Sequence, residues 1–120
     1  MKPSLVKEKS YAFALRTSAL TRWRKEQKKF EVAGQLLWSG TAIGLNVKKA
    51  LDGISRADFI AKMSIASKES QETHYWLRLL GDAIVIPETK ILPLENECSE
   101  LVRMLTAIVK TSQSTTPTQN

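Results

Sequence analysis

The sequence predicts an all-α protein, an antiparallel up-down-up-down bundle of four helices. Apolar residues recur every three or four positions in four long segments, and turn-forming residues fall between these segments. A length of 120 residues suits one hydrophobic core. We expect residues 1–110 to form the bundle and residues 111–120 to form a flexible polar tail, because the tail has no apolar group to offset the entropy of ordering.

The first two helices are expected at about residues 4–28 and 31–51. In the first, the predicted core face comprises Leu5, Ala12, Leu15, Ala19 and Trp23, with Phe13 and Leu20 beside it. In the second, it comprises Ala33, Leu36, Gly40, Ile43, Val47 and Ala50. Gly40 and Gly44 each cost a helix interior about 1 kcal/mol, which predicts close approach of a neighbouring helix. A helix break at residues 39–41 is the alternative.

The third helix is expected to start at the possible capping box of residues 55–58 and to run to about residue 82, and the fourth to start between Pro87 and Leu94 and run to residue 110. Asp52 and Gly53 supply the turn before the third helix, and Ser55 resembles an N-cap. The predicted core face of the third helix comprises Phe59, Met63, Ala66, Ser70, Thr73, Leu77 and Leu80. That of the fourth comprises Leu94, Cys98, Leu101, Leu105 and Ile108.

The composition argues against several classes of function. No apolar stretch is long enough for a membrane span, and the first residues lack a secretory signal, so we expect a cytoplasmic protein. One cysteine, Cys98, and one histidine, His74, cannot form a disulfide or a Cys/His metal site within the chain. Glu69 and Glu72 share a helix face that His74 does not, so no acid–base site is expected. We therefore expect no enzymatic activity, no metal and no cofactor.

Positive charge is concentrated in the first half of the chain. Residues 1–56 contain 12 Lys and Arg against 4 Asp and Glu, whereas residues 57–120 contain 6 against 8. The candidate nucleic-acid-binding residues are Arg22, Arg24, Lys25, Lys28 and Lys29 near the end of the first helix, and Lys48 and Lys49 at the end of the second. A structural alternative for the first cluster is complementation of the helix dipole.

Several large apolar residues lie off the predicted core faces and require cover. They are Leu37, Trp38, Leu45, Ile60, Ile65, Trp76 and Leu79. Self-association through a second interface, with Gly40, Gly44, Trp38 and Trp76 as packing residues, is one explanation. A thick core within one chain is the other.

Residues 35–50, QLLWSGTAIGLNVKKA, carry a family resemblance, as do residues 58–80, DFIAKMSIASKESQETHYWLRLL, and 100–110. They resemble the bacterial four-helix bundle proteins encoded in intervening sequences of 23S ribosomal RNA genes. The resemblance covers about residues 10–112. Departures from the family pattern are Trp38, Ala42, Leu45 and Lys49; the last replaces a glutamate and puts any family ion pair there in doubt.

The resemblance implies a left-handed bundle that assembles into a ring of five. It also implies kinship with the accessory proteins of diversity-generating retroelements, which bind a reverse transcriptase and nucleic acid and have no enzymatic activity. We therefore expect a homopentamer that binds RNA or DNA without sequence preference, with a reverse transcriptase as a further partner. The alternative is an oligomeric protein scaffold with no role in nucleic-acid binding.

Overall fold

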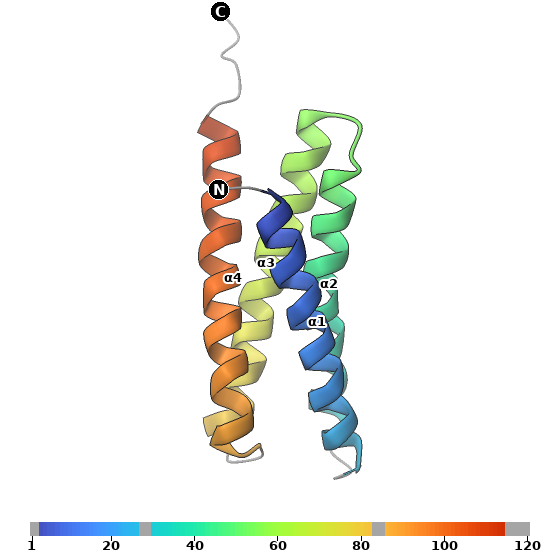
Figure 1. Cartoon of the computed structure of the whole chain (residues 1–120), viewed down its shortest axis with the longest axis vertical. Coiled ribbons are helices and arrows are strands. Elements are labelled where there is room, and N and C mark those ends of the chain that lie inside the picture. The colour runs from blue at the N-terminus through green and yellow to red at the C-terminus, as the bar shows by residue number, and fades with distance from the viewer. Residues whose placement is uncertain (1–2, 27–29, 83–85, 115–120) are drawn as a thin grey trace, which may run out of the picture.

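The protein is an antiparallel bundle of four helices. The structure, a computed structural model, describes the backbone of residues 3–26, 30–82 and 86–114, and side chains of residues 4–20, 34–82 and 86–114. The helices are α1 (Pro3–Glu26), α2 (Phe30–Leu51), α3 (Arg56–Asp82) and α4 (Glu88–Ser114). They alternate in direction, so that α1 begins and α4 ends at the same end of the bundle (Figure 1). The predicted fold class and topology are confirmed.

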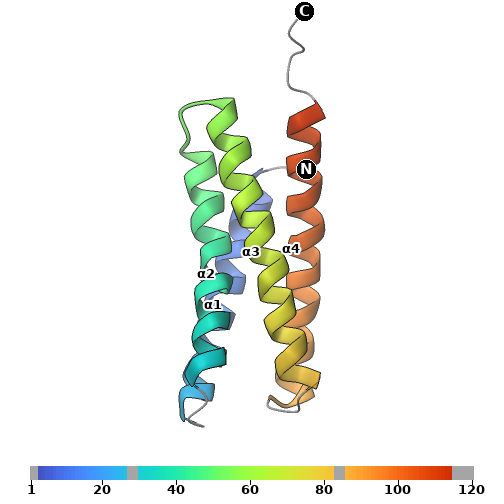
Figure 2. The same ribbon diagram turned by 180° about the vertical axis from the view of Figure 1, so that it is seen from behind.

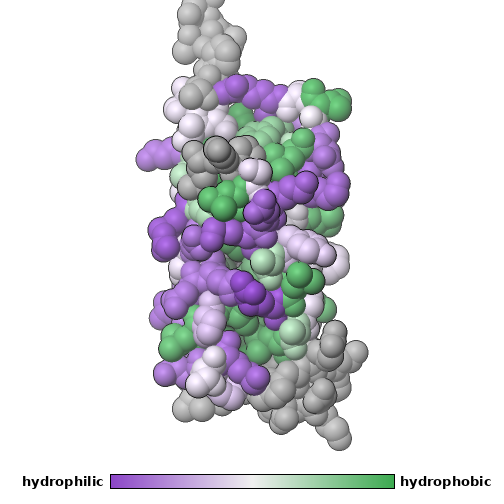
Figure 3. Space-filling view, in the orientation of Figure 1, coloured by the Kyte–Doolittle hydropathy of each residue, from purple (hydrophilic) through white to green (hydrophobic). Residues whose placement is uncertain are grey.

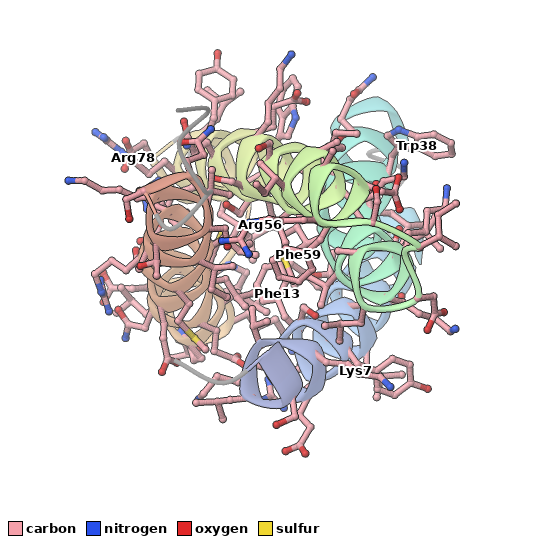
Figure 4. The ribbon with its side chains drawn as sticks, turned by 90° about the horizontal axis from the view of Figure 1, so that it is seen from above. Lys7, Phe13, Trp38, Arg56, Phe59 and Arg78 are labelled. Atoms are coloured by element: carbon pink, nitrogen blue, oxygen red, sulfur yellow. The ribbon has the colours of Figure 1, made fainter. Side chains whose placement is uncertain are left out.

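The bundle turns in the expected left-handed sense. Seen from above, with α1 running away from the viewer, α1, α2, α3 and α4 follow one another counterclockwise (Figure 4). Helices consecutive in the chain pack along most of their length, and α1 contacts α4 less extensively. Figure 1 shows α1 and α4 diverging toward the end where α1 stops.

The core is built from apolar residues at alternating spacings of three and four. Every predicted core residue of α2 and α4 that the structure describes is buried, and in α3 only Phe59 is partly buried. Thr73 Oγ1 donates to Ser39 Oγ at 2.9 Å within this core and fixes the register of α3 against α2. Phe13 and Phe59 both lie inside the ring of helices (Figure 4).

The predicted core face of α1 is wrong by one position. Phe13 and Leu20, predicted beside it, are buried. Ala12 is only partly buried, Ala19 is exposed, and the side chain of Trp23 lies outside the described residues. Leu5 and Leu15 are 44% and 56% exposed. The buried residues are Val6, Ser10, Phe13, Thr17 and Leu20. Two of them carry hydroxyls, so an apolar pattern does not identify this face.

Glycines on α2 explain why small polar residues face the core from α1. A Cβ added to Gly40 would lie 2.8 Å from Thr17 Cγ2, and one added to Gly44 would lie 3.4 Å from the Ser10 carbonyl oxygen. The two helices therefore approach closely, as predicted, and α2 runs unbroken through both glycines. The alternative of a helix break at residues 39–41 is wrong.

The starts of α3 and α4 follow from a capping side chain and a proline. Ser55 Oγ accepts a hydrogen bond from the Asp58 amide at 3.0 Å, which confirms Ser55 as the N-cap of α3. α4 begins directly after Pro87 and includes Pro93.

The predicted tail begins four residues too early, since residues 111–114 continue α4. Arg56 Nη2 donates to the Ser112 carbonyl oxygen at 3.2 Å, which ties this last turn to α3. The polarity of residues 111–114 therefore does not prevent their ordering. The rest of the predicted tail, residues 115–120, lies outside the described residues.

Candidate protein and nucleic-acid interfaces

The outer surface between α2 and α3 carries an apolar face. We call it the α2–α3 face and define it by Trp38 and Leu45, seven residues apart on α2, and Ile65 on α3, all of which lie off the core faces. Their exposed fractions are 74%, 52% and 43%. Trp38 points away from the core (Figure 4). These three residues belong to the seven off-core residues that the sequence predicted to need cover; the bundle leaves them exposed, whereas Ile60 and Trp76 are partly buried.

The second predicted packing tryptophan is used mainly within the chain. Trp76 is partly buried and packs against the core. Its ring meets that of Tyr75 edge to face, with centroids 5.1 Å apart. Trp38 is therefore the exposed tryptophan of the α2–α3 face, whereas Trp76 belongs in part to the core.

A carboxylate without a partner lies beside this face. Glu69 Oε1 is buried and has no hydrogen-bond partner among the described residues. Burial raises the pKa of Glu69, and the negative charge of Glu72 raises it further, whereas Lys68 lowers it. No ion pair joins Lys68, Glu69 or Glu72 to another described residue of the chain.

The main predicted basic cluster lies partly outside the described residues. The backbone of residues 22–25 belongs to the last turns of α1, as expected. The side chains of Arg22, Arg24 and Lys25, and all of Lys28 and Lys29, lie outside the described residues. Of this cluster, the structure therefore describes only the backbone of residues 22, 24 and 25.

The second predicted patch is partly neutralised. Lys48 Nζ lies 2.7 Å from Asp52 Oδ2, and this contact, with a smaller contribution from Lys7, lowers the pKa of Asp52. The beginning of α1 and the end of α2 therefore lie together, as predicted. Lys49 is exposed and lines a hollow at the turn into α3. Lys9 does not join this patch, because its Nζ pairs with Glu100 of α4 at 3.2 Å.

A second ion pair joins α1 to α4. Arg16 Nη2 lies 2.6 Å from Glu97 Oε2, and Arg16 Nε lies 2.7 Å from both carboxylate oxygens. The carboxylate raises the pKa of Arg16 through its hydrogen bonds and its charge. On this face, hydrophobic surface is scattered among hydrophilic surface and does not form one patch (Figure 3). The two ion pairs connect α1 and α4, which make the smallest contact among the helix pairs that pack together.

Two adjoining hollows lie along the outer surface of α3, and one of them extends to α4. Gln71 and His74 line both of them. Ser99, Val102 and Arg103 complete one, and Tyr75, Arg78, Leu79 and Asp82 complete the other. We call this surface the α3–α4 groove. Sequence reasoning missed its two arginines, although Gln71, His74 and Arg78 recur at spacings of three and four on α3.

Other chemical features of the described residues are limited. No three of their His, Cys, Asp or Glu side chains are placed to hold a metal ion. Cys98 is buried, its Sγ donates to the Ser70 carbonyl oxygen at 3.3 Å, and burial raises its pKa to about 12. Over the part of the chain that the structure describes, no helix has the length and apolarity to span a membrane.

Comparisons with known proteins agree with the resemblance seen in the sequence. Residues 2–107 match the family model of the 23S rRNA-intervening sequence protein. A crystal structure at 1.70 Å of a protein of unknown function from the S23 ribosomal protein family of Bacteroides thetaiotaomicron is 42% identical, with a TM-score of 0.86. That match covers 92% of this chain and 99% of the other. No functionally curated protein matches the chain. The chain belongs to the family of 23S rRNA-intervening sequence proteins.

Proposed function

We propose that this chain assembles into a homo-oligomeric ring, of five copies as the resemblance implies, and that the ring binds RNA or DNA without sequence preference. It catalyses no reaction in this role. The observation that carries the proposal is the exposed α2–α3 face, with Trp38 74% exposed, on a chain whose net charge is +6.

The α2–α3 face supports self-association. Covering apolar surface stabilises a complex by roughly 25 cal/mol for each Å² removed from water. A closed ring requires this face to meet a different surface of the next copy, because identical faces that meet produce only a two-fold dimer. The unpaired Glu69 carboxylate beside the face would then gain a cation from the neighbouring copy.

The charge supports a polyanionic partner. A ring repeats the net charge of +6 and every basic surface around its axis. Such repetition increases the attraction for a polyanion and the number of phosphate contacts that one nucleic acid can make. A reverse transcriptase of a diversity-generating retroelement is the protein partner that the resemblance suggests for this ring.

Self-association is tested by Trp38→Ser, with Tyr11→Ser as the matched control. Tyr11 is 66% exposed on α1 and lies outside the α2–α3 face. Both changes leave the core intact, so each should alter the unfolding free energy of one chain by no more than about 0.5 kcal/mol. Light scattering should give a mass of several chains for wild type and Tyr11→Ser, and a lower mass for Trp38→Ser. An unchanged Trp38→Ser oligomer would reject this face as the interface.

Nucleic-acid binding is tested by titrating labelled RNA and DNA with the wild-type protein at about 50 mM and about 200 mM salt. Binding through several phosphates should weaken steeply between these concentrations. Absence of binding at the lower salt would reject the nucleic-acid role. Co-purification of a reverse transcriptase encoded beside the gene, lost in the monomeric Trp38→Ser variant, would support the accessory role.

One observation favours the second candidate, an oligomeric protein scaffold. Four described cations, Lys9, Arg16, Lys48 and Lys62, are already paired with carboxylates of the same chain. A scaffold would oligomerise through the α2–α3 face and show no salt-sensitive binding of RNA or DNA. The two measurements above therefore separate the candidates.

A further inference from the structure

We propose that the α3–α4 groove is the site that holds a single-stranded segment of nucleic acid. Arg78 and Arg103 bind neighbouring phosphates, and Tyr75 and His74 lie against the bases. This inference rests on the proposed nucleic-acid role and adds to it a site in the acidic half of the chain.

The geometry provides a continuous track along two helices. The two hollows share Gln71 and His74, so a chain lying in one continues into the other. Arg103 lines one hollow from α4, and Arg78 lines the other from α3. Figure 2 shows α3 and α4 running side by side, and Figure 4 shows Arg78 on the outer side of the bundle, away from the core.

The arginines of the groove are available for phosphate. Both are exposed, and neither has an ion pair with a described residue. Guanidinium groups bind phosphate oxygens through two parallel hydrogen bonds, which gives geometric selectivity as well as charge. Asp82 lies at one end of the groove and limits the track there, since it repels a phosphate.

Two carboxylates of α4, Glu97 and Glu100, do not cancel this positive charge. Glu97 and Glu100 face α1, where Arg16 and Lys9 neutralise them. Arg103 is six residues from Glu97, which places it about 120° away around the helix. α1 therefore compensates Glu97 and Glu100. Glu95, which shares a stripe of α4 with Ser99 and Arg103 and lies near Gly81 of α3, adds a negative charge at the same end of the groove as Asp82.

The aromatic groups favour a single strand over a duplex. Tyr75 is 60% exposed, and its edge-to-face contact with Trp76 restricts the ring before any ligand binds. Stacking of unpaired bases on such rings contributes about 1–3 kcal/mol per base and does not depend on sequence. A duplex keeps its bases stacked on one another, so it can use the arginines but not Tyr75 or His74. Gln71 and Ser99 supply neutral hydrogen-bonding groups for sugar or base edges.

The test compares Arg78→Ala/Arg103→Ala with the control Lys68→Ala/Lys110→Ala. Each pair removes one exposed cation from α3 and one from α4, so net charge changes equally, but Lys68 and Lys110 do not line the groove. Binding of a labelled oligo(U) or oligo(dT) of about 16 nucleotides, near the upper limit for one single-strand site, is measured by fluorescence anisotropy at several salt concentrations. Circular dichroism and light scattering check that the variants fold and assemble as wild type does.

We expect the arginine variant to bind at least about tenfold more weakly than the lysine control. Its slope of log K against log salt should fall by about 1.4, since each lost phosphate contact of a single strand removes about 0.7. Tyr75→Ala should weaken single-strand binding about tenfold or more and leave duplex binding unchanged. Arg78→Lys/Arg103→Lys should restore much of the salt dependence.

Failure of this inference is distinct from failure of the proposed function. If the wild-type protein binds but the arginine variant matches the lysine control in affinity and slope, the groove is not the site. If a duplex of equal length competes as well as the single strand, the stacking role is wrong. If the wild-type protein binds no nucleic acid at about 50 mM salt, the nucleic-acid function itself falls.

Discussion

Replacing Gly40 with alanine tests how closely α1 and α2 are packed. The new Cβ would lie 2.8 Å from Thr17 Cγ2 and 3.1 Å from Thr17 Oγ1. Carbon atoms in favourable contact are about 3.5–4.0 Å apart, so either α1 moves by about 1 Å or Thr17 changes rotamer. Thr17 is fully buried and β-branched, which leaves few rotamers in a helix. The substitution is therefore expected to strain the interface.

The size of the effect follows from comparison with Gly34 on the same helix. Alanine in place of glycine stabilises a helix interior by about 1 kcal/mol, and at Gly34 nothing lies within 4 Å of the added Cβ. Gly34→Ala should therefore raise the free energy of unfolding by up to about 1 kcal/mol. Gly40→Ala has the same intrinsic gain but also an overpacking cost of about 1–3 kcal/mol. We expect a difference of that size between the two variants.

Urea unfolding followed by circular dichroism measures this difference, at one protein concentration because assembly contributes to stability. Equal stabilisation by both substitutions would refute the close approach of the helices at Gly40. Thr17→Ala supplies a further check, because it removes the clashing methyl and a buried hydroxyl that has no hydrogen-bond partner among the described residues. Gly40→Ala should be better tolerated in that background, with a coupling energy of at least about 0.5 kcal/mol.

Three further predictions concern charged and reactive groups. Burial raises the pKa of Glu69, so at pH values between its unfolded and folded pKa the folded chain binds more protons than the unfolded chain, and the free energy of unfolding falls as pH rises. Glu69→Gln should remove this fall; the same dependence of stability on pH in monomeric wild type and variant would contradict the prediction. A double-mutant cycle on Arg16 and Glu97, both partly exposed, should give a coupling energy for unfolding of about 1 kcal/mol or less, and added salt should reduce it. A coupling energy of zero at low salt would show that the pair does not form. Burial raises the pKa of Cys98 to about 12, so Cys98 should react with iodoacetamide much more slowly in the native protein than in the urea-unfolded protein. Equal rates would show that Cys98 is not buried in the core.

Three of the four core faces could be predicted because they use apolar residues at helical spacing. The face of α1 could not, because Ser10 and Thr17 occupy two of its positions. Their small side chains fit opposite Gly44 and Gly40, where a larger residue would force the helices apart. In this bundle, two glycines four residues apart on α2 lie opposite two small residues seven apart on α1. That relation between helices is a better guide to α1 than its own hydropathy.

The candidate sites were predicted less completely than the fold, because ion pairing depends on which helices become neighbours. Lys9 and Glu100 are 91 residues apart in the sequence, so counting charges along the chain cannot show that they neutralise each other. The same count gives residues 57–120 an acidic excess, so it does not identify Arg78 and Arg103 as candidate binding residues. By contrast, the exposed apolar residues of the α2–α3 face were predicted, because they fall off every core stripe.

The placement of charge around α4 connects the stability of the bundle with its proposed binding surface. Carboxylates on one side of α4 hold α1 in place, and Arg103 on another side lines the α3–α4 groove. Arg16→Ala should therefore weaken the contact between α1 and α4 while leaving the groove arginines where they are, since α3 and α4 pack through their own apolar seam. If the groove is the binding site, this variant should be less stable than wild type but should bind a single strand almost as tightly. The small remaining difference in affinity would come from the loss of one positive charge far from the groove. If the free carboxylate of Glu97 instead abolished binding, the nucleic acid would have to pass along the α1–α4 side of the bundle.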